Sequence, residues 1–250
     1  MNKYTENNSR IQKGIKVLKK EGVLKFITRF SWYLKRLLRR KFSFIIIPLL
    51  PKKTFEFNGR KLKYFYHKHN LTWTNERAVE IAVIRDYLNQ NFSNIKDPKI
   101  LEVGAVLPHY YNYPFDVLDK FEKGSGIINE DVVSFKSEKK YDLIISISTL
   151  EHVGFDDDDK DPMKILKAFD NLKKCLNKYG KIIFTVPLGY NPDLDKLIFN
   201  DELKLSEQYF LKRYSGINWK QINKEQAKGA KYGIYNSLSA TVIVFGIINN

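Results

Sequence analysis

The sequence predicts an α/β protein in which an open, mostly parallel sheet follows a basic helical segment. Strand-like and helical stretches alternate from residue 99 onward, and a strand, a helix and a strand follow one another between residues 141 and 186. That succession implies a parallel strand pair joined by a right-handed crossover. With 250 residues, 43% of them hydrophobic and 28% charged, the chain can form one domain with an appendage or two small domains. This composition excludes disorder over most of its length.

The positive charge lies at the N-terminal end. Residues 1–75 contain 19 Lys and Arg against 3 Asp and Glu, whereas residues 76–250 contain 24 against 25. The net charge of +15 therefore describes a near-neutral domain behind a basic segment. A nucleic-acid-binding protein would also carry basic residues on the binding domain itself, so this distribution makes nucleic acid a less favoured partner.

Residues 11–41 have the pattern of an amphipathic helix, with a break at Gly22. Apolar residues recur at spacings of three and four, and Lys and Arg fill the positions between them. Such a helix is typical of an anionic membrane surface. Packing on the main domain or on another subunit, and a nucleic-acid arm, are the alternatives. The apolar stretch that follows contains Pro48 and is bounded by Pro51, which predicts a connector rather than a helix.

Targeting and redox features point to the cytoplasm, with possible peripheral association at the inner face of the cell membrane. No run reaches the ~18 apolar residues of a membrane-spanning helix, and we expect no signal peptide. The single cysteine, Cys175, excludes a disulfide framework and a cysteine-ligated zinc site. With four histidines the chain has few ligands for a transition-metal site, so no metal is expected.

Three segments are expected along the chain. Residues 1–51 form the leader, residues 52–98 contain a hairpin and a helix, and residues 99–250 form the core domain. Asn58-Gly59 between two alternating runs predicts the hairpin turn. Thr74 is the expected N-cap of a helix that ends near Asn91.

Six strands are predicted in the core domain, and one helix is expected between the fourth and the fifth. The helix begins at Asp161-Pro162 and ends at Gly180. The strands are residues 99–103, 115–119, 126–129, 141–147, 181–186 and 239–248. Only residues 120–126 separate the second strand from the third, fewer than the dozen or so that a parallel crossover normally needs. Either that crossover helix is reduced to a turn or one strand is misplaced.

Acidic residues stand at the carboxyl ends of three predicted strands. They are Glu102, Asp119 and Asp131, and Gly104 follows the first of them. Ligands of open parallel sheets bind at these strand ends. Carboxylates accept hydrogen bonds from ribose hydroxyls or amino groups, and a glycine permits close approach of a ligand.

The stretches LEVGAVLPHY, VLDKF, INEDV and YDLIISISTLEHVGFD, followed by KIIFTVP, resemble the successive cofactor motifs of class I S-adenosylmethionine-dependent methyltransferases. The resemblance covers about residues 76–250. Its glycine loop is reduced, as in glycan-modifying members, because Ala105 follows Gly104 where the family usually has further glycines. It implies a Rossmann-like, mostly parallel sheet with a C-terminal antiparallel strand.

The resemblance also implies the roles of individual residues. Glu102, Gly104 and Ala105 would hold the methionine part of S-adenosylmethionine, Asp119 the ribose and Asp131 the adenine amino group. Glu122 is the nearest competitor of Asp119. Ser148 and Thr149, with the Glu151-His152 pair that follows, would line the methyl-donor pocket.

The expected reaction is methyl transfer to a hydroxyl of a sugar, a glycan precursor or another small molecule near the membrane. His152 is the predicted general base, although it could instead only cap its helix. His109, Tyr110, Tyr190 and Asn191 are the predicted acceptor-binding residues. An RNA methyltransferase with a basic arm, and a methyltransferase-like module that binds without turnover, are the alternatives.

Two polar stretches have less specific interpretations. The tract DDDDKD at residues 156–161 is expected to be a solvated loop that leads to a helix. Residues 75–77 and Glu80 could reach the cofactor, or could form an ordinary salt-bridged surface.

Overall fold

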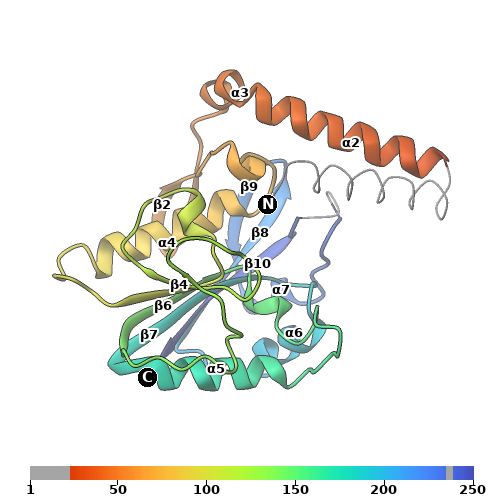
Figure 1. Cartoon of the computed structure of the whole chain (residues 1–250). Coiled ribbons are helices and arrows are strands. Elements are labelled where there is room, and N and C mark those ends of the chain that lie inside the picture. The colour runs from red at the N-terminus through yellow and green to blue at the C-terminus, as the bar shows by residue number, and fades with distance from the viewer. Residues whose placement is uncertain (1–22, 235–238) are drawn as a thin grey trace. The chain divides into compact units, whose positions relative to one another are not determined.

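The computed structural model describes residues 23–234 and 239–250 (Figure 1). The chain divides into two compact units, residues 1–50 and 51–250. The predicted helix over residues 11–22 and its break at Gly22 lie outside the described residues.

The described part of the first unit is helical. It consists of α2 (Val23–Lys41) and α3 (Ser43–Leu49). The prediction of a non-helical connector over residues 43–51 was wrong, because residues 43–49 form α3 and Pro48 falls in its last turn. A proline there removes a single helical hydrogen bond, and the N–H of Leu50 still bonds to the carbonyls of Ile46 and Ile47. Among the described residues, no helix is long and apolar enough to cross a membrane.

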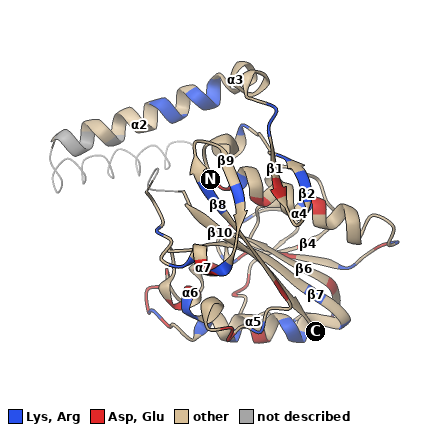
Figure 2. Ribbon diagram, turned by 180° about the vertical axis from the view of Figure 1, so that it is seen from behind, with Lys and Arg blue, Asp and Glu red and all other residues tan. Residues whose placement is uncertain are grey.

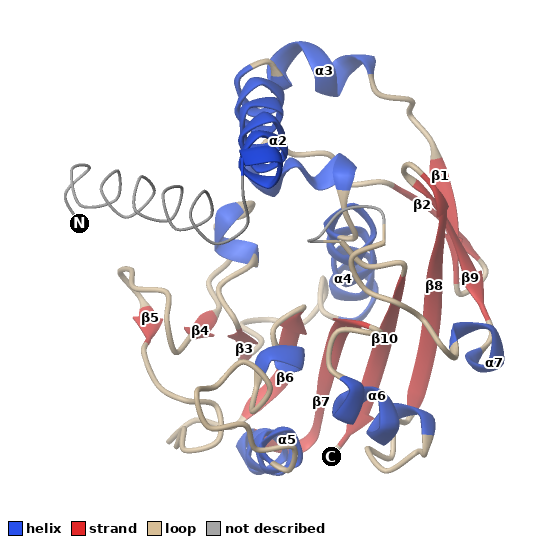
Figure 3. Cartoon of the chain, turned by 90° about the vertical axis from the view of Figure 1, so that its right-hand side faces the viewer, coloured by secondary structure: helices blue, strands red, loops and turns tan. Residues whose placement is uncertain are grey.

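The second unit is built on an eight-stranded sheet of order β5-β4-β3-β6-β7-β10-β8-β9 (Figure 3). Its strands are β3 (Ile100–Val103), β4 (Asp116–Leu118), β5 (Ile127–Ile128), β6 (Tyr141–Ile147), β7 (Leu176–Pro187), β8 (Glu207–Ser215), β9 (Asn218–Ile222) and β10 (Val242–Asn249). Strands β3 to β7 are mutually parallel, and β10 runs antiparallel to both β7 and β8. The predicted fold class, a mostly parallel Rossmann-like sheet with an antiparallel C-terminal strand, is confirmed.

Helices cover both faces of this sheet. Helix α4 (Arg77–Asn91) lies on one face, while α5 (Lys164–Cys175) and α6 (Pro192–Phe199) lie on the other (Figures 1 and 3). Each face has its own apolar core. Strands β3, β6 and β7 are buried on both faces, which explains the continuous apolar runs in their sequences.

The predicted hairpin is confirmed. Strand β1 (Thr54–Phe57) pairs antiparallel with β2 (Arg60–Lys63). Asn58 and Gly59 have φ angles of 47° and 75°, as a tight two-residue turn of this hand requires.

Two element boundaries differ from the predictions. Thr74 does not cap α4: its hydroxyl donates to the carbonyl of Leu71, and the Asn75 side chain accepts the N–H of Arg77. Helix α5 ends at Cys175 instead of Gly180, because residues 176–180 already belong to β7, whose Leu176 pairs with Tyr141. Strand pairing across the sheet therefore overrides the helical pattern of these residues.

Further elements were not predicted. They are α6, β8, β9, the short helix α7 (Lys224–Ala227) and three single 3-10 turns. The crossover between β4 and β5 contains no helix, so the first of the two alternatives for that short connection is correct.

Candidate functional site

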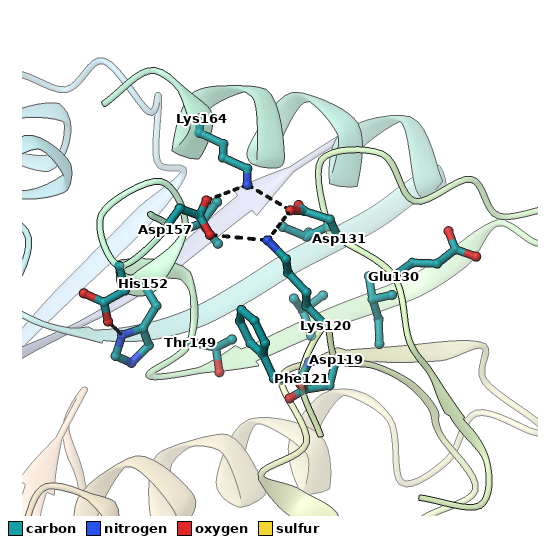
Figure 4. A pocket seen from close by; sticks show the side chains of 15 residues that line it. Asp119, Lys120, Phe121, Glu130, Asp131, Thr149, His152, Asp157 and Lys164 are labelled. Carbon is teal, nitrogen blue, oxygen red and sulfur yellow. Dashed lines mark hydrogen bonds and ion pairs between the residues drawn. The ribbon is translucent and has the colours of Figure 1, made fainter. Parts of the chain in front are cut away.

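A cleft of about 380 Å³ lies at the carboxyl ends of β3, β4 and β6 (Figure 4). Its volume is within the usual range for small-molecule and cofactor sites. Four predicted cofactor residues and the predicted base line it: Gly104, Asp119, Asp131, Thr149 and His152. The succession of strand-end residues in the sequence is therefore brought together in one place by the parallel sheet.

Gly104 forms the floor of this cleft and cannot be replaced without displacing Thr149. Its φ is +88°, in the left-handed region that favours glycine, and a Cβ atom there would lie 2.1 Å from Thr149 Oγ1. A single glycine thus suffices in this loop, since only this position combines a positive φ with so close an approach.

The carboxylate of Asp119 organises the loops around the cleft. Its Oδ2 accepts the backbone N–H of Ala105 at 2.9 Å, and its Oδ1 accepts the N–H groups of Phe121 and Glu122 at 2.8 Å each. A carboxylate can accept about four hydrogen bonds, so one further site remains for a ligand hydroxyl.

Asp131 lies in a ring of four charges at one end of the cleft (Figure 4). Its Oδ2 is 3.0 Å from Lys120 Nζ and 2.8 Å from Lys164 Nζ, and both lysines also pair with Asp157. Burial alone would raise the pKa of Asp131, but hydrogen bonds from Lys164, the Val133 N–H and Lys120 lower it to about 2. A ligand amino group that approaches Asp131 must therefore compete with two ammonium groups.

Glu102 is fully buried beside the glycine loop. Its Oε1 accepts the N–H groups of Val106 and Leu107 at 3.1 and 2.7 Å, whereas its Oε2 has no hydrogen-bond partner among the described residues. Burial raises the pKa of Glu102 to about 8, against the lowering effect of those two N–H groups and of Arg77. An orphaned buried carboxyl oxygen is costly, and a polar group of a ligand would relieve it by accepting from the protonated form or donating to the ionised form.

A buried ionic cluster lies on the α4 side of the strand ends. Arg77 pairs with Glu80 at 2.9 Å, and Glu80 also accepts the hydroxyl of Ser148 at 2.5 Å. Glu76 and Glu151 complete this cluster. Burial and the other carboxylates raise the pKa of Glu76 to about 7 and that of Glu151 well above its usual range. The cluster holds more carboxylates than cations, so it suits a ligand with a cationic group.

Glu76, Arg77 and Glu80 do not form an exposed salt-bridged surface, which was one of the two interpretations of the sequence. Glu76 and Glu80 are buried, and only 13% of the Arg77 side chain is exposed. Buried charges need partners, and here the strand ends and the glycine loop surround them.

His152 stands at the rim of the cleft and is held by an acid. Its Nδ1 lies 2.6 Å from Asp156 Oδ2, and the hydroxyl of Tyr190 donates to the same oxygen at 2.6 Å. The ring of Tyr190 packs edge-on against the imidazole, and the ring of Tyr232 packs edge-on against Tyr190. An Asp156 acceptor at Nδ1 fixes the imidazole so that its Nε2 lone pair is available for a proton.

The remaining predicted residues lie away from the cleft. His109 and Tyr110 line a separate aromatic hollow of about 440 Å³, where His109 pairs with Glu122 at 3.1 Å. Asn191 is buried and its side chain is engaged: it caps α6 and donates to the carbonyl of Glu151. Ser148 points to Glu80, and its φ of 40° stores strain at the end of β6.

Four cleft residues were missed in the sequence. Lys120 and Lys164 were not singled out, and Asp156 and Asp157 were taken as part of a solvated tract. Asp158 and Asp159 are exposed as expected. The position of Lys120 directly after Asp119 was a usable signal, whereas Lys164 reaches Asp131 only through the packing of α5.

Across residues 23–234 and 239–250, no group of three or more His, Cys, Asp or Glu side chains is placed to hold a metal ion. The donor set of the cleft instead fits an organic ligand with hydroxyl and amino groups, because single carboxylates face it from different strands.

Comparisons with known proteins found similarity among solved structures. No family model and no curated protein matches the chain. Among solved structures, it is similar to the N-methyltransferase NodS from Bradyrhizobium japonicum WM9, with 14% identity, 70% of this chain and 87% of that chain covered, and a TM-score of 0.44. It is also similar to an rRNA methylase from Streptococcus thermophilus, with 8% identity, 68% and 96% covered, and a TM-score of 0.40. A third is an S-adenosylmethionine-dependent methyltransferase from Clostridium acetobutylicum, with 12% identity, 66% and 88% covered, and a TM-score of 0.35.

Sequence identities and TM-scores this low do not identify an activity.

Proposed function

We propose that this protein transfers a methyl group from S-adenosylmethionine to a hydroxyl of a sugar or glycan precursor. The observation that supports it most is the cleft in which Gly104, Asp119 and Asp131 meet His152. Each acid stands at a different strand end, in the order in which a nucleoside would cross the sheet edge.

The residues present fit the cofactor. Asp119 has an acceptor site left for a ribose hydroxyl, and the orphaned oxygen of Glu102 has a hydrogen-bonding site left for a polar group of a ligand. Arg77 and Glu80 offer one charge of each sign, which suits the carboxylate and ammonium of an amino-acid end. When bound, the cofactor supplies an electrophilic methyl group on a sulfonium.

The chain's own contribution is alignment and removal of a proton. His152 would accept at Nε2 the proton that the acceptor hydroxyl loses when its oxygen takes the methyl group from the bound cofactor. A base within hydrogen-bond reach accelerates such a step by about 10²–10⁴-fold. Asp156 stabilises the imidazolium that results, since it lies 2.6 Å from Nδ1.

The aromatic rings at the rim support a sugar as acceptor. The ring of Tyr190 packs edge-on against His152, and Phe155 and Tyr232 in turn pack against Tyr190. Such rings combine apolar contact area with a polar hydroxyl, and a sugar ring presents the complementary apolar faces and hydroxyls.

Calorimetric titration with S-adenosylhomocysteine tests the cofactor, and transfer of labelled methyl groups to a panel of free and lipid-linked saccharides tests the acceptor. We expect binding that weakens at least tenfold in Asp119→Ala. We also expect transfer that falls about 10²–10⁴-fold in His152→Gln with cofactor binding unchanged. Absence of binding would overturn the cofactor assignment. Binding without transfer to any saccharide would favour a module without turnover, and transfer to RNA would favour the RNA alternative.

A further inference from the structure

The two helices of the first unit carry exposed apolar and basic residues together. On α2, Ile27, Leu34 and Leu38 are 45–55% exposed, and Leu37 is 43% exposed. At 3.6 residues per turn these four residues fall within about 100° of arc, so they form one stripe along the helix. On α3, Phe44 is 71% exposed and Leu49 is 79% exposed.

Basic residues predominate on the rest of the α2 surface, together with the exposed rings of Trp32 and Tyr33. The helix contains seven Lys and Arg, and its last turn is Arg39, Arg40 and Lys41 (Figure 2). These three residues form no ion pair with any residue in the described part of the chain. The sequence has no Asp or Glu between Glu21 and Glu56, so neither helix offers an acidic partner.

We propose that α2 and α3 lie in the interface of an anionic lipid bilayer, with the apolar stripe among the acyl chains and the basic residues at the headgroups. A large apolar stripe that includes an aromatic residue, here Phe30, and a strongly basic opposite face characterise helices that lie in this plane. The seven basic residues prevent α2 from crossing the bilayer, in agreement with the absence of a spanning helix among the described residues.

Two other binding partners would each contact favourably only the apolar residues or only the basic residues of this surface. A second copy of the chain could cover the apolar stripe, but it would bring two strongly basic helices together without a single acid to separate them. A nucleic acid would neutralise the basic residues and leave the leucines in water. An anionic bilayer satisfies both sets at once.

This inference goes beyond the proposed function and does not depend on the cleft. Flotation of the full chain with vesicles of phosphatidylcholine, with and without phosphatidylglycerol, tests it. We expect strong binding only when phosphatidylglycerol is present. The triple variant R39Q/R40Q/K41Q should lose on the order of a hundredfold in partition coefficient, because each basic residue near such a surface contributes about a fivefold factor. The triple variant L34S/L37S/L38S should lose at least as much.

A matched control removes the same number of charges elsewhere. Lys61 and Lys63 are exposed on β2 and Lys220 is exposed on β9, so K61Q/K63Q/K220Q should bind within about threefold of the parent chain. Titration with S-adenosylhomocysteine should give the same affinity for all variants, which separates this inference from the proposed function.

Several results would overturn the inference. An equal loss in the control would show that overall charge determines binding. Unchanged binding of L34S/L37S/L38S would exclude insertion of the stripe. Self-association of the parent chain that disappears in this variant, without vesicle binding, would identify a second copy as the occupant. Retention on RNA in place of vesicles would identify nucleic acid.

Discussion

Replacement of Gly104 by alanine tests the geometry on which the cleft depends. Two costs add at this position. The φ of +88° is unfavourable for any residue with a Cβ, which costs about 1–2 kcal/mol. The new Cβ would also lie 2.1 Å from Oγ1 and 2.7 Å from Cγ2 of Thr149, and overpacking of this kind costs typically about 1–3 kcal/mol. We therefore expect the free energy of unfolding to fall by about 2–5 kcal/mol.

A matched glycine separates the two costs. Gly59 has a φ of +75° and nothing within 4 Å of its Cβ position, so Gly59→Ala should show the backbone cost alone. In the background of Thr149→Gly, which removes all three atoms that the new Cβ would meet, Gly104→Ala should cost no more than Gly59→Ala does.

Urea denaturation measures these differences, and calorimetry with S-adenosylhomocysteine reports on the cleft. We expect Gly104→Ala to weaken binding at least tenfold and Gly59→Ala to leave it unchanged. The reasoning would be refuted if Gly104→Ala were as stable as Gly59→Ala and bound the ligand normally.

Two further changes probe the charges around the cleft. Glu102 keeps its proton up to about pH 8 in the folded chain, whereas in the unfolded chain it ionises near its ordinary pKa. The folded state thus binds more protons between these values, so Glu102 should contribute a fall in stability of about 1.4 kcal/mol per pH unit from pH 5.5 to 7.5. Glu76 and Glu151, whose pKa values are also raised, add to the total slope, so Glu102→Gln should reduce that slope by about this amount in urea titrations; an unchanged slope would be evidence against the raised pKa of Glu102. Lys120→Met removes one ammonium that competes for Asp131 and should raise the affinity for S-adenosylhomocysteine by about 3–10-fold. The control Lys196→Met, which breaks an exposed ion pair with Asp193, should leave this affinity unchanged. A weaker affinity in Lys120→Met would mean that the lysine itself holds the ligand.

Local patterns in the sequence were sufficient for the framework of the fold. The turn at Asn58-Gly59 has the conformation that its residue types require, and the apolar run of 141–147 forms the central strand β6. The strand-end acids also followed from the sequence, because parallel strands bring their carboxyl ends to one edge of the sheet.

Other features depend on residues far apart in the chain. The helical pattern of residues 164–180 gave no sign that Leu176 would pair with Tyr141, nor did the sequence indicate that Glu80 would be buried against Ser148. Both contacts join segments that are far apart in the sequence.

The sequence by itself therefore determined the hairpin turn, the buried strands of the parallel part of the sheet, where the positive charge lies, and which acids follow the strands, since these properties depend on neighbouring residues. The tertiary structure alone decided how many hydrogen bonds each acid has left for a ligand. Asp119 retains one site, Asp131 is shared by two lysines, and Glu102 has a free oxygen. The physical reason is that the pKa of a carboxylate and its unused hydrogen-bonding sites depend on burial and on partners far away in the sequence. Both exist only once distant segments are packed together.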